Sequence, residues 1–132
     1  MQLRRAPALT YESVVQEVTN SDLDAFLRDS IAFLQNSHVA KGPPFAIYLG
    51  CDKDDAQLVE VCLPTERGSK ELPAADVAYT VAHGAECDYP AILSAHDAVV
   101  KFAGDCGRAL DGPPRETYLG ESVMEIAFPL AG

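Results

Sequence analysis

The stretch GPPFAIYLG at residues 42–50 returns as GPPRETYLG at residues 112–120, with six of nine positions identical at an offset of 70. In both copies the prolines end the preceding connection, because a proline ring cannot continue a helix, and the residues after them are typical of a strand. Other matches keep the same order: Val15 recurs as Val81 at an offset of 66, and residues 60–64 recur as 125–129 at an offset of 65. Ordered matches across separate elements indicate an internal duplication, with repeat halves at about 9–64 and 75–130.

Each half has the pattern of a strand, a helix and two further strands. The helix of the first half begins near Asn20 or Ser21, and its apolar residues recur at helical spacing. The predicted strands are residues 9–18, 45–49, 58–63, 77–83, 115–119 and 123–130, the second helix runs from about Asp88 to Cys106, a polar turn covers 52–56, and residues 67–70 are a loop.

This pattern predicts an α+β fold of duplicated βαββ units with pseudo-twofold symmetry. One antiparallel sheet system would carry both helices on one face and a ligand groove on the other. The 132 residues match the length of a single domain, 1–132, that can bury a core of its own.

Because side chains alternate across a strand, each strand divides into a helix-facing set and an open-face set. The predicted helix-facing set is apolar: Phe45, Ile47, Leu49, Val59, Val61, Leu63, Leu119, Met124, Ile126 and Phe128. The predicted open face holds tyrosines, carboxylates and small residues: Ala46, Tyr48, Glu60, Cys62, Glu116, Tyr118, Glu125 and Ala127, and Tyr79 is added as a further candidate ligand-binding residue.

Three glutamates in mid-strand positions on one face are unusual, because acidic residues are poor strand formers. A groove with tyrosine walls and carboxylates suits a lipophilic cation or a planar polycycle, since aromatic faces and desolvated negative charge both attract delocalised positive charge. Glu125 or Glu116, if desolvated and protonated, would be able to act as a general acid. The alternative is a solvated sheet face on which these glutamates are ordinary surface residues.

Composition and motifs exclude several other classes of function. With 20 acidic against 10 basic residues the charge is −10, which disfavours direct binding of nucleic acid. The four cysteines form no CxxC pair and the three histidines have no metal-like spacing, so neither a metal nor another cofactor is predicted. No stretch is long and apolar enough for secretion or membrane insertion, which predicts a cytoplasmic protein with reduced thiols.

Several ordered segments together resemble the GyrI-like small-molecule-binding domain, which is also the effector-binding domain of multidrug-responsive MerR-type and AraC-type transcription activators. The resemblance runs from about Leu9 to Leu130, through the segments 42–48, 59–64, 71–74, 83–84, 112–118 and 124–130. It implies a duplicated βαββ fold, binding of bulky cationic or polycyclic compounds, aromatic walls at Tyr48 and Tyr118, and acidic groove residues at Glu116 and Glu125. The chain departs from the family pattern at Gly84-Ala85-Glu86, where members often have Gly-Pro-Tyr, so the ligand class is open.

The resulting hypothesis is a stand-alone binding protein for hydrophobic, cationic or polycyclic small molecules. Stand-alone members of the family also include hydrolases that open cyclopropane-bearing natural products, and in that alternative Glu125 or Glu116 would be catalytic. A third alternative is an inhibitor that binds a protein partner such as DNA gyrase. A homodimer and a separate DNA-binding partner are both left open.

Overall fold

Antiparallel strands and one long helix build each of two units in this chain, so the predicted α+β class is confirmed. The computed structural model describes residues 1–51 and 56–132. One unit is Leu9–Leu72, and the other combines Met1–Ala8 with Pro73–Gly132. Each unit contains one of the predicted repeat halves. That the whole chain acts as a single domain stays a prediction.

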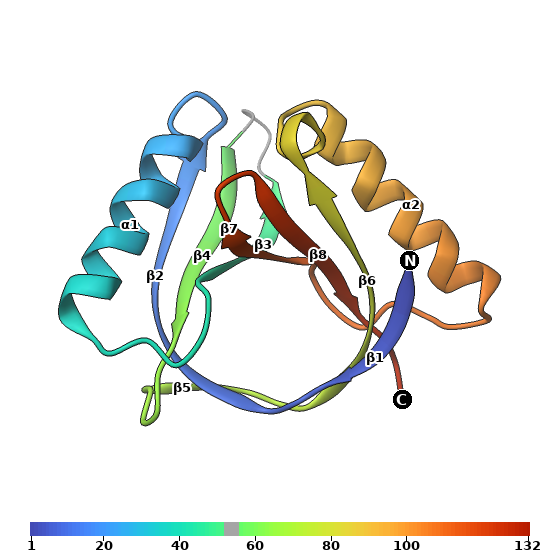
Figure 1. Cartoon of the computed structure of the whole chain (residues 1–132), viewed down its shortest axis with the longest axis horizontal. Helices are drawn as coiled ribbons and strands as arrows, with labels where there is room; N and C mark the ends of the chain where they lie inside the picture. Colours follow the sequence, from blue (N-terminus) through green and yellow to red (C-terminus); the bar gives the residue numbers. More distant parts are fainter. Residues whose placement is uncertain (52–55) are drawn as a thin grey trace. The chain divides into compact units, whose positions relative to one another are not determined.

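The unit Leu9–Leu72 holds four strands in the order β5-β2-β4-β3. These are β2 (Leu9–Thr19), β3 (Phe45–Cys51), β4 (Ala56–Pro64) and β5 (Lys70–Leu72), and the helix is α1 (Leu23–Ser37). In Figure 1, α1 runs alongside β2 and β4, and both strands contact it. Residues 52–55 of the predicted polar turn lie outside the described residues, and Ala56 already belongs to β4.

The other unit repeats this plan with strands in the order β1-β6-β8-β7. These are β1 (Gln2–Ala6), β6 (Ala75–His83), β7 (Arg115–Gly120) and β8 (Val123–Pro129). A short 3-10 helix, η1 (Gly84–Cys87), precedes α2 (Ala91–Asp105), which packs on β6 and β8 (Figure 1). The core under α2 contains Ala78, Ala82, Val99, Ala103, Ile126, Phe128 and Leu130.

Both halves follow the predicted order of strand, helix, strand and strand, but the sequence did not predict β1 and β5. Each of these short strands adds an outer strand to its unit, since β1 pairs with β6 and β5 pairs with β2. Both strands lie outside the predicted repeat halves. Lys70, placed in a loop by the sequence, begins β5. The turn before β5 needs a glycine, because a Cβ on Gly68 would lie 2.3 Å from the backbone nitrogen of Tyr11.

The side chains of β3 and β7 face the opposite way from the prediction. Residues paired across antiparallel strands share a sheet face. Glu116 is paired with Ile126, and Tyr118 with Met124, both of which pack in the core under α2. The predicted open-face position of Glu116 and Tyr118 is therefore wrong.

The same correction applies to β3. Ala46 is paired with Val61, which is paired in turn with Val14, and Val14 lines a hollow with residues of α1. Tyr48, paired with Val59, shares that helix side, so the open-face prediction for Ala46 and Tyr48 is also wrong.

Phe45 and Ile47, predicted to face the helix, lie on the other side of the sheet. They form an apolar cluster there with Tyr11 and Cys62. Hydrophobicity could not identify the buried face of β3, because both of its faces are buried. Leu49 and Leu119 lie where each hairpin changes register, and slightly less than half of each residue is exposed.

The assignments for β4 and β8 are confirmed. Val59, Val61 and Leu63 share the α1 side of β4, while Met124, Ile126 and Phe128 share the α2 side of β8. Glu60 and Cys62 on β4, and Glu125 and Ala127 on β8, lie on the sheet faces away from the helices. Among the described residues, no helix is both long and apolar enough to cross a membrane.

Candidate functional site

Two buried glutamates occupy corresponding positions in the two units. Glu60 lies in β4 opposite Val15 of β2, and Glu125 lies in β8 opposite Val81 of β6. Only 7% of Glu60 and 8% of Glu125 is exposed to solvent. A carboxylate removed from water to this degree is costly unless a cation or hydrogen-bond donors compensate it. Each glutamate therefore needs a cation or hydrogen-bond donors beside it, and both find them within their own unit.

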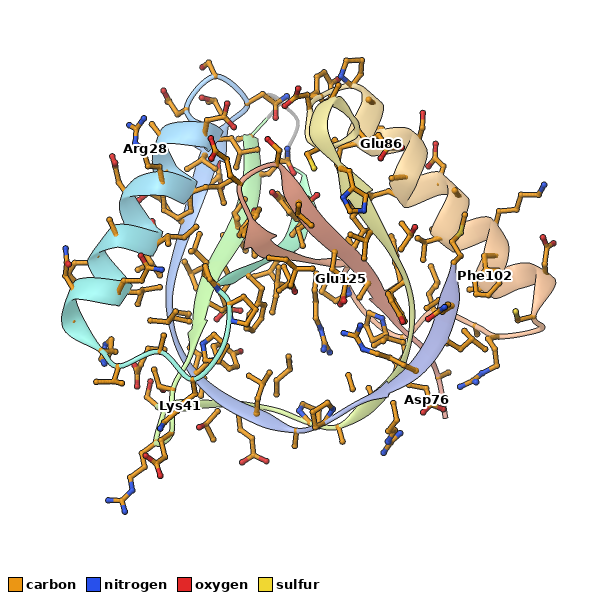
Figure 2. All side chains as sticks on the ribbon, viewed as in Figure 1. Arg28, Lys41, Asp76, Glu86, Phe102 and Glu125 are labelled. Atoms are coloured by element: carbon orange, nitrogen blue, oxygen red, sulfur yellow. The ribbon has the colours of Figure 1, made fainter. Side chains whose placement is uncertain are left out.

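Arg4 of β1 is the partner of Glu125. Its Nη1 and Nη2 donate to the two carboxylate oxygens of Glu125, each at 2.6 Å, in a bidentate pair. The hydrogen bond to Glu125 raises the pKa of Arg4 above its ordinary value. Figure 2 labels Glu125 on β8, on the side of that strand away from α2. Both oxygens of this carboxylate are thus engaged by one guanidinium.

Tyr79 of β6 completes this group. The guanidinium carbon of Arg4 lies 4.4 Å from the centre of the Tyr79 ring, within the range of a cation–π contact. The Tyr79 hydroxyl donates to Gln2 Oε1 at 2.6 Å, which orients the ring. Arg4, Tyr79 and Glu125 form what we call the Arg4 site. It presents a carboxylate and an aromatic ring to one delocalised cation.

Glu60 is compensated differently. Lys70 Nζ of β5 donates to Glu60 Oε2 at 2.7 Å, and Ser13 Oγ of β2 donates to the same oxygen at 2.8 Å. Beside Glu60 lies the cluster of Tyr11, Phe45, Ile47 and Cys62, in which the rings of Tyr11 and Phe45 are 5.7 Å apart. This face of the unit therefore combines a carboxylate with aromatic and aliphatic side chains.

The two cations are themselves related by the duplication. Lys70 is paired with Tyr11 in β2, and Arg4 is paired with Val77 in β6. Tyr11 and Val77 correspond at the offset of 66 that also relates Val15 to Val81. The pairing of a buried glutamate with a cation on the edge strand two positions away in the sheet is therefore a repeated feature, although β1 lies at the start of the chain and β5 in its middle.

Glu116 belongs to the helix side of its unit. His96 of α2 lies with Nε2 2.8 Å from Glu116 Oε2, and only 18% and 8% of the two side chains is exposed. The His96 ring also packs edge-on against Phe128, with centroids 5.7 Å apart. This arrangement connects helix to sheet. It does not bring Glu116 to the face that carries Glu125.

Of the predicted ligand-binding residues, Tyr79 and Glu125 meet at the Arg4 site, and Glu60 and Cys62 share the face of β4 that lies away from α1. Ala46, Tyr48, Glu116 and Tyr118 lie on helix sides. A ligand-binding role for any of the eight stays a prediction, as does a groove shared by the two halves. The sequence analysis missed Arg4, Ser13 and Lys70. The one available signal was that a mid-strand glutamate, once buried, requires a hydrogen-bond donor from another strand.

A separate open hollow of about 620 Å³ lies between β2 and α1. Its acidic lining residues are Glu17, Asp22 and Asp29, and its apolar ones include Val14 and Phe26. It is on the helix side of the unit, so it is distinct from the face that carries Glu60. Within the described ranges no group of histidine, cysteine and acidic residues is arranged to hold a metal ion.

The chain has the GyrI-like fold, which confirms the resemblance seen in its sequence. In the complex of EcmrR with DNA, 98% of this chain matches 56% of the EcmrR chain at 19% identity and a TM-score of 0.78. The separate C-terminal domain of EcmrR matches over 96% of its length, with 98% of this chain covered, at 17% identity and a TM-score of 0.77. This chain thus spans little more than half of the longer EcmrR chain.

SAV2435 in complex with tetraphenylphosphonium is also similar. The match covers 99% of this chain and 93% of SAV2435, at 16% identity and a TM-score of 0.67. Comparison with protein-family models and with curated proteins gave no match. At these identities the similarity shows a shared fold and does not identify a ligand.

Proposed function

We propose that this chain binds hydrophobic organic cations, and that Glu125 and Tyr79 recognise their charge. The observation that carries the proposal is the Arg4 site, where a carboxylate and an aromatic ring already hold a delocalised cation. These two groups attract any cation whose charge is spread over a planar or aromatic body. The tetraphenylphosphonium bound by SAV2435, a protein of the same fold, belongs to the same chemical class.

The Glu60 face offers a second carboxylate with an apolar surround. Phe45, Ile47 and Cys62 surround this carboxylate with buried apolar side chains, and Lys70 and Ser13 donate hydrogen bonds to it. We propose Glu60 as a second contributor to the binding of these cations. An effector-binding role, as in the transcription activators that the sequence resembles, is part of the same proposal.

The test is calorimetric titration of the purified chain with tetraphenylphosphonium and, in parallel, with the neutral triphenylphosphine oxide. We expect the cation to bind more tightly. Glu125→Gln keeps the size of the side chain and removes its charge, and we expect a loss of about tenfold or more, equivalent to about 1.4 kcal/mol. Glu60→Gln is expected to cause a smaller loss.

Two carboxylates provide matched controls with the same change of charge. Glu116→Gln alters the helix side of the same unit, and Glu17→Gln alters the hollow beside α1. Both are expected to leave the affinity within about twofold of wild type, a difference of about 0.4 kcal/mol. Loss of affinity in Glu17→Gln but not in Glu125→Gln would place the site in the hollow and reject the proposal. Undetectable binding of tetraphenylphosphonium would also reject it.

The hydrolase alternative stays a prediction, and it is not part of this proposal. Both oxygens of Glu125 accept from Arg4, and Glu116 is held by His96 on the helix side of its unit.

A further inference from the structure

Arg4 makes the contacts that a bound organic cation would make. Its guanidinium is planar and delocalised, it donates two hydrogen bonds to Glu125, and it lies over the Tyr79 ring. A ligand that uses Glu125 and Tyr79 must therefore meet the same two groups that Arg4 already occupies. The two cations cannot both hold them.

Arg4 is placed so that it can leave without opening the core. β1 has five residues, four of them exposed, and it contacts the rest of its unit as an edge strand beside β6. The Arg4 side chain is 40% exposed, whereas that of Glu125 is 11% exposed. Long, partly exposed side chains on edge strands can change rotamer at low cost, because few packed neighbours have to move with them.

We propose that Arg4 is a built-in occupant of the cation site, which an organic cation displaces from Glu125 on binding. This proposal rests on the proposed function and deepens it by naming the ligand class. Planar amidinium and guanidinium groups on an aromatic body replace Arg4 most completely, because they supply both paired N–H donors and a delocalised charge. Arylphosphonium ions supply the charge alone.

A built-in occupant lowers the apparent affinity by the fraction of molecules in which the site is free. When Arg4 occupies the site in about nine molecules of ten, its removal strengthens binding about tenfold. If Arg4 only supported the fold, its removal would weaken binding or leave it unchanged. The sign of the change therefore separates the two roles of Arg4.

The experiment titrates the full chain with the fluorescent bis-amidine 4′,6-diamidino-2-phenylindole. Arg4→Gln is compared with Arg5→Gln, which removes the same charge from the adjacent residue. Arg5 contacts the partly exposed Asp76 at 3.3 Å and takes no part in the Arg4 site. We expect Arg4→Gln to bind the dye about tenfold more tightly than Arg5→Gln, following the occupancy estimate.

Equal or weaker binding in Arg4→Gln than in Arg5→Gln would overturn the proposal. Glu125→Gln separates this failure from that of the proposed function. When Glu125→Gln loses binding but Arg4→Gln shows no gain, the site stands and only the displacement is rejected. When Glu125→Gln binds as wild type does, the site itself is rejected.

A measurement on the wild-type chain keeps the test valid if Arg4→Gln does not fold. The Nε–Hε resonance of Arg4, followed by NMR, reports whether its guanidinium is held or free. We expect it to move to the position of a solvent-exposed arginine as the dye saturates the protein. An Arg4 resonance unchanged at saturation would overturn the displacement.

Discussion

The contact between His96 and Glu116 allows a quantitative test of which face of β7 carries Glu116. In the other unit the corresponding positions are apolar. Glu116 corresponds to Ala46 in the repeat, and aligning the buried positions of the two helices places His96 with Leu27. The double variant His96→Leu/Glu116→Ala therefore replaces the polar pair with the apolar residues found at the corresponding positions of the other unit. The two single variants each replace one member of the pair.

The expected costs follow from burial and distance. His96→Leu removes the partner 2.8 Å from Glu116 and leaves a carboxylate with 8% of its side chain exposed. An unsatisfied buried group costs about 1–3 kcal/mol, and more when charged, so we expect a loss of about 2–4 kcal/mol. Glu116→Ala leaves a small cavity and an unpaired imidazole nitrogen, for which we expect about 1–3 kcal/mol.

The double variant removes both polar groups together, so no buried group is left unpaired. We expect its loss to be smaller than the sum of the single losses by about 1–2 kcal/mol, the size usual for contacting polar pairs. Urea unfolding of the four proteins, analysed by linear extrapolation, measures this coupling. Single losses that add within about 0.5 kcal/mol would refute the contact. They would also reopen the question of which face Glu116 occupies.

Two further predictions concern other ionisable groups. Hydrogen bonds from Arg108, and then from Arg5, hold the pKa of the Asp76 carboxyl (labelled in Figure 2) below its ordinary value. This stabilisation is present above about pH 4 and is lost as pH falls through the lowered folded-state pKa, so Asp76→Asn should lose less stability than wild type on acidification in chemical unfolding. Equal acid sensitivity would contradict this. Burial raises the pKa of the Cys87 thiol, so at neutral pH iodoacetamide should alkylate exposed Cys106 faster, as mapped by mass spectrometry. Equal rates would count against the described burial of Cys87.

The sequence alone was sufficient to predict the order of strands and helices within the two repeat halves. The duplicated Gly-Pro-Pro turns and the helical spacing of apolar residues are local signals, and they located six of the eight strands and both long helices that the described residues form. It also identified Glu60 and Glu125 as unusual, because a glutamate in the middle of a buried strand contradicts local propensity. The faces of β4 and β8 followed from plain alternation of apolar and polar residues.

Alternation was not informative for β3. Phe45 and Ile47 are apolar, yet they lie away from α1, because the sheet buries both of its faces at this point. In β7 the polar residue Glu116 is on the helix side, where His96 from a distant segment compensates it. The alternation of residues within β7 cannot indicate that His96, 20 residues away, will pair with Glu116. These assignments therefore depended on the packed structure.

The sequence alone establishes the duplication, the α+β class, the acidic charge and the position of two glutamates in equivalent strands. How those glutamates are compensated depends on the packing of the folded strands. Arg4 and Lys70 lie in β1 and β5, strands too short and too polar to be recognised from the sequence, and Arg4 is 121 residues from Glu125 along the chain. Charge pairing over such separations depends on which strands become neighbours, and strand order is a property of the folded sheet.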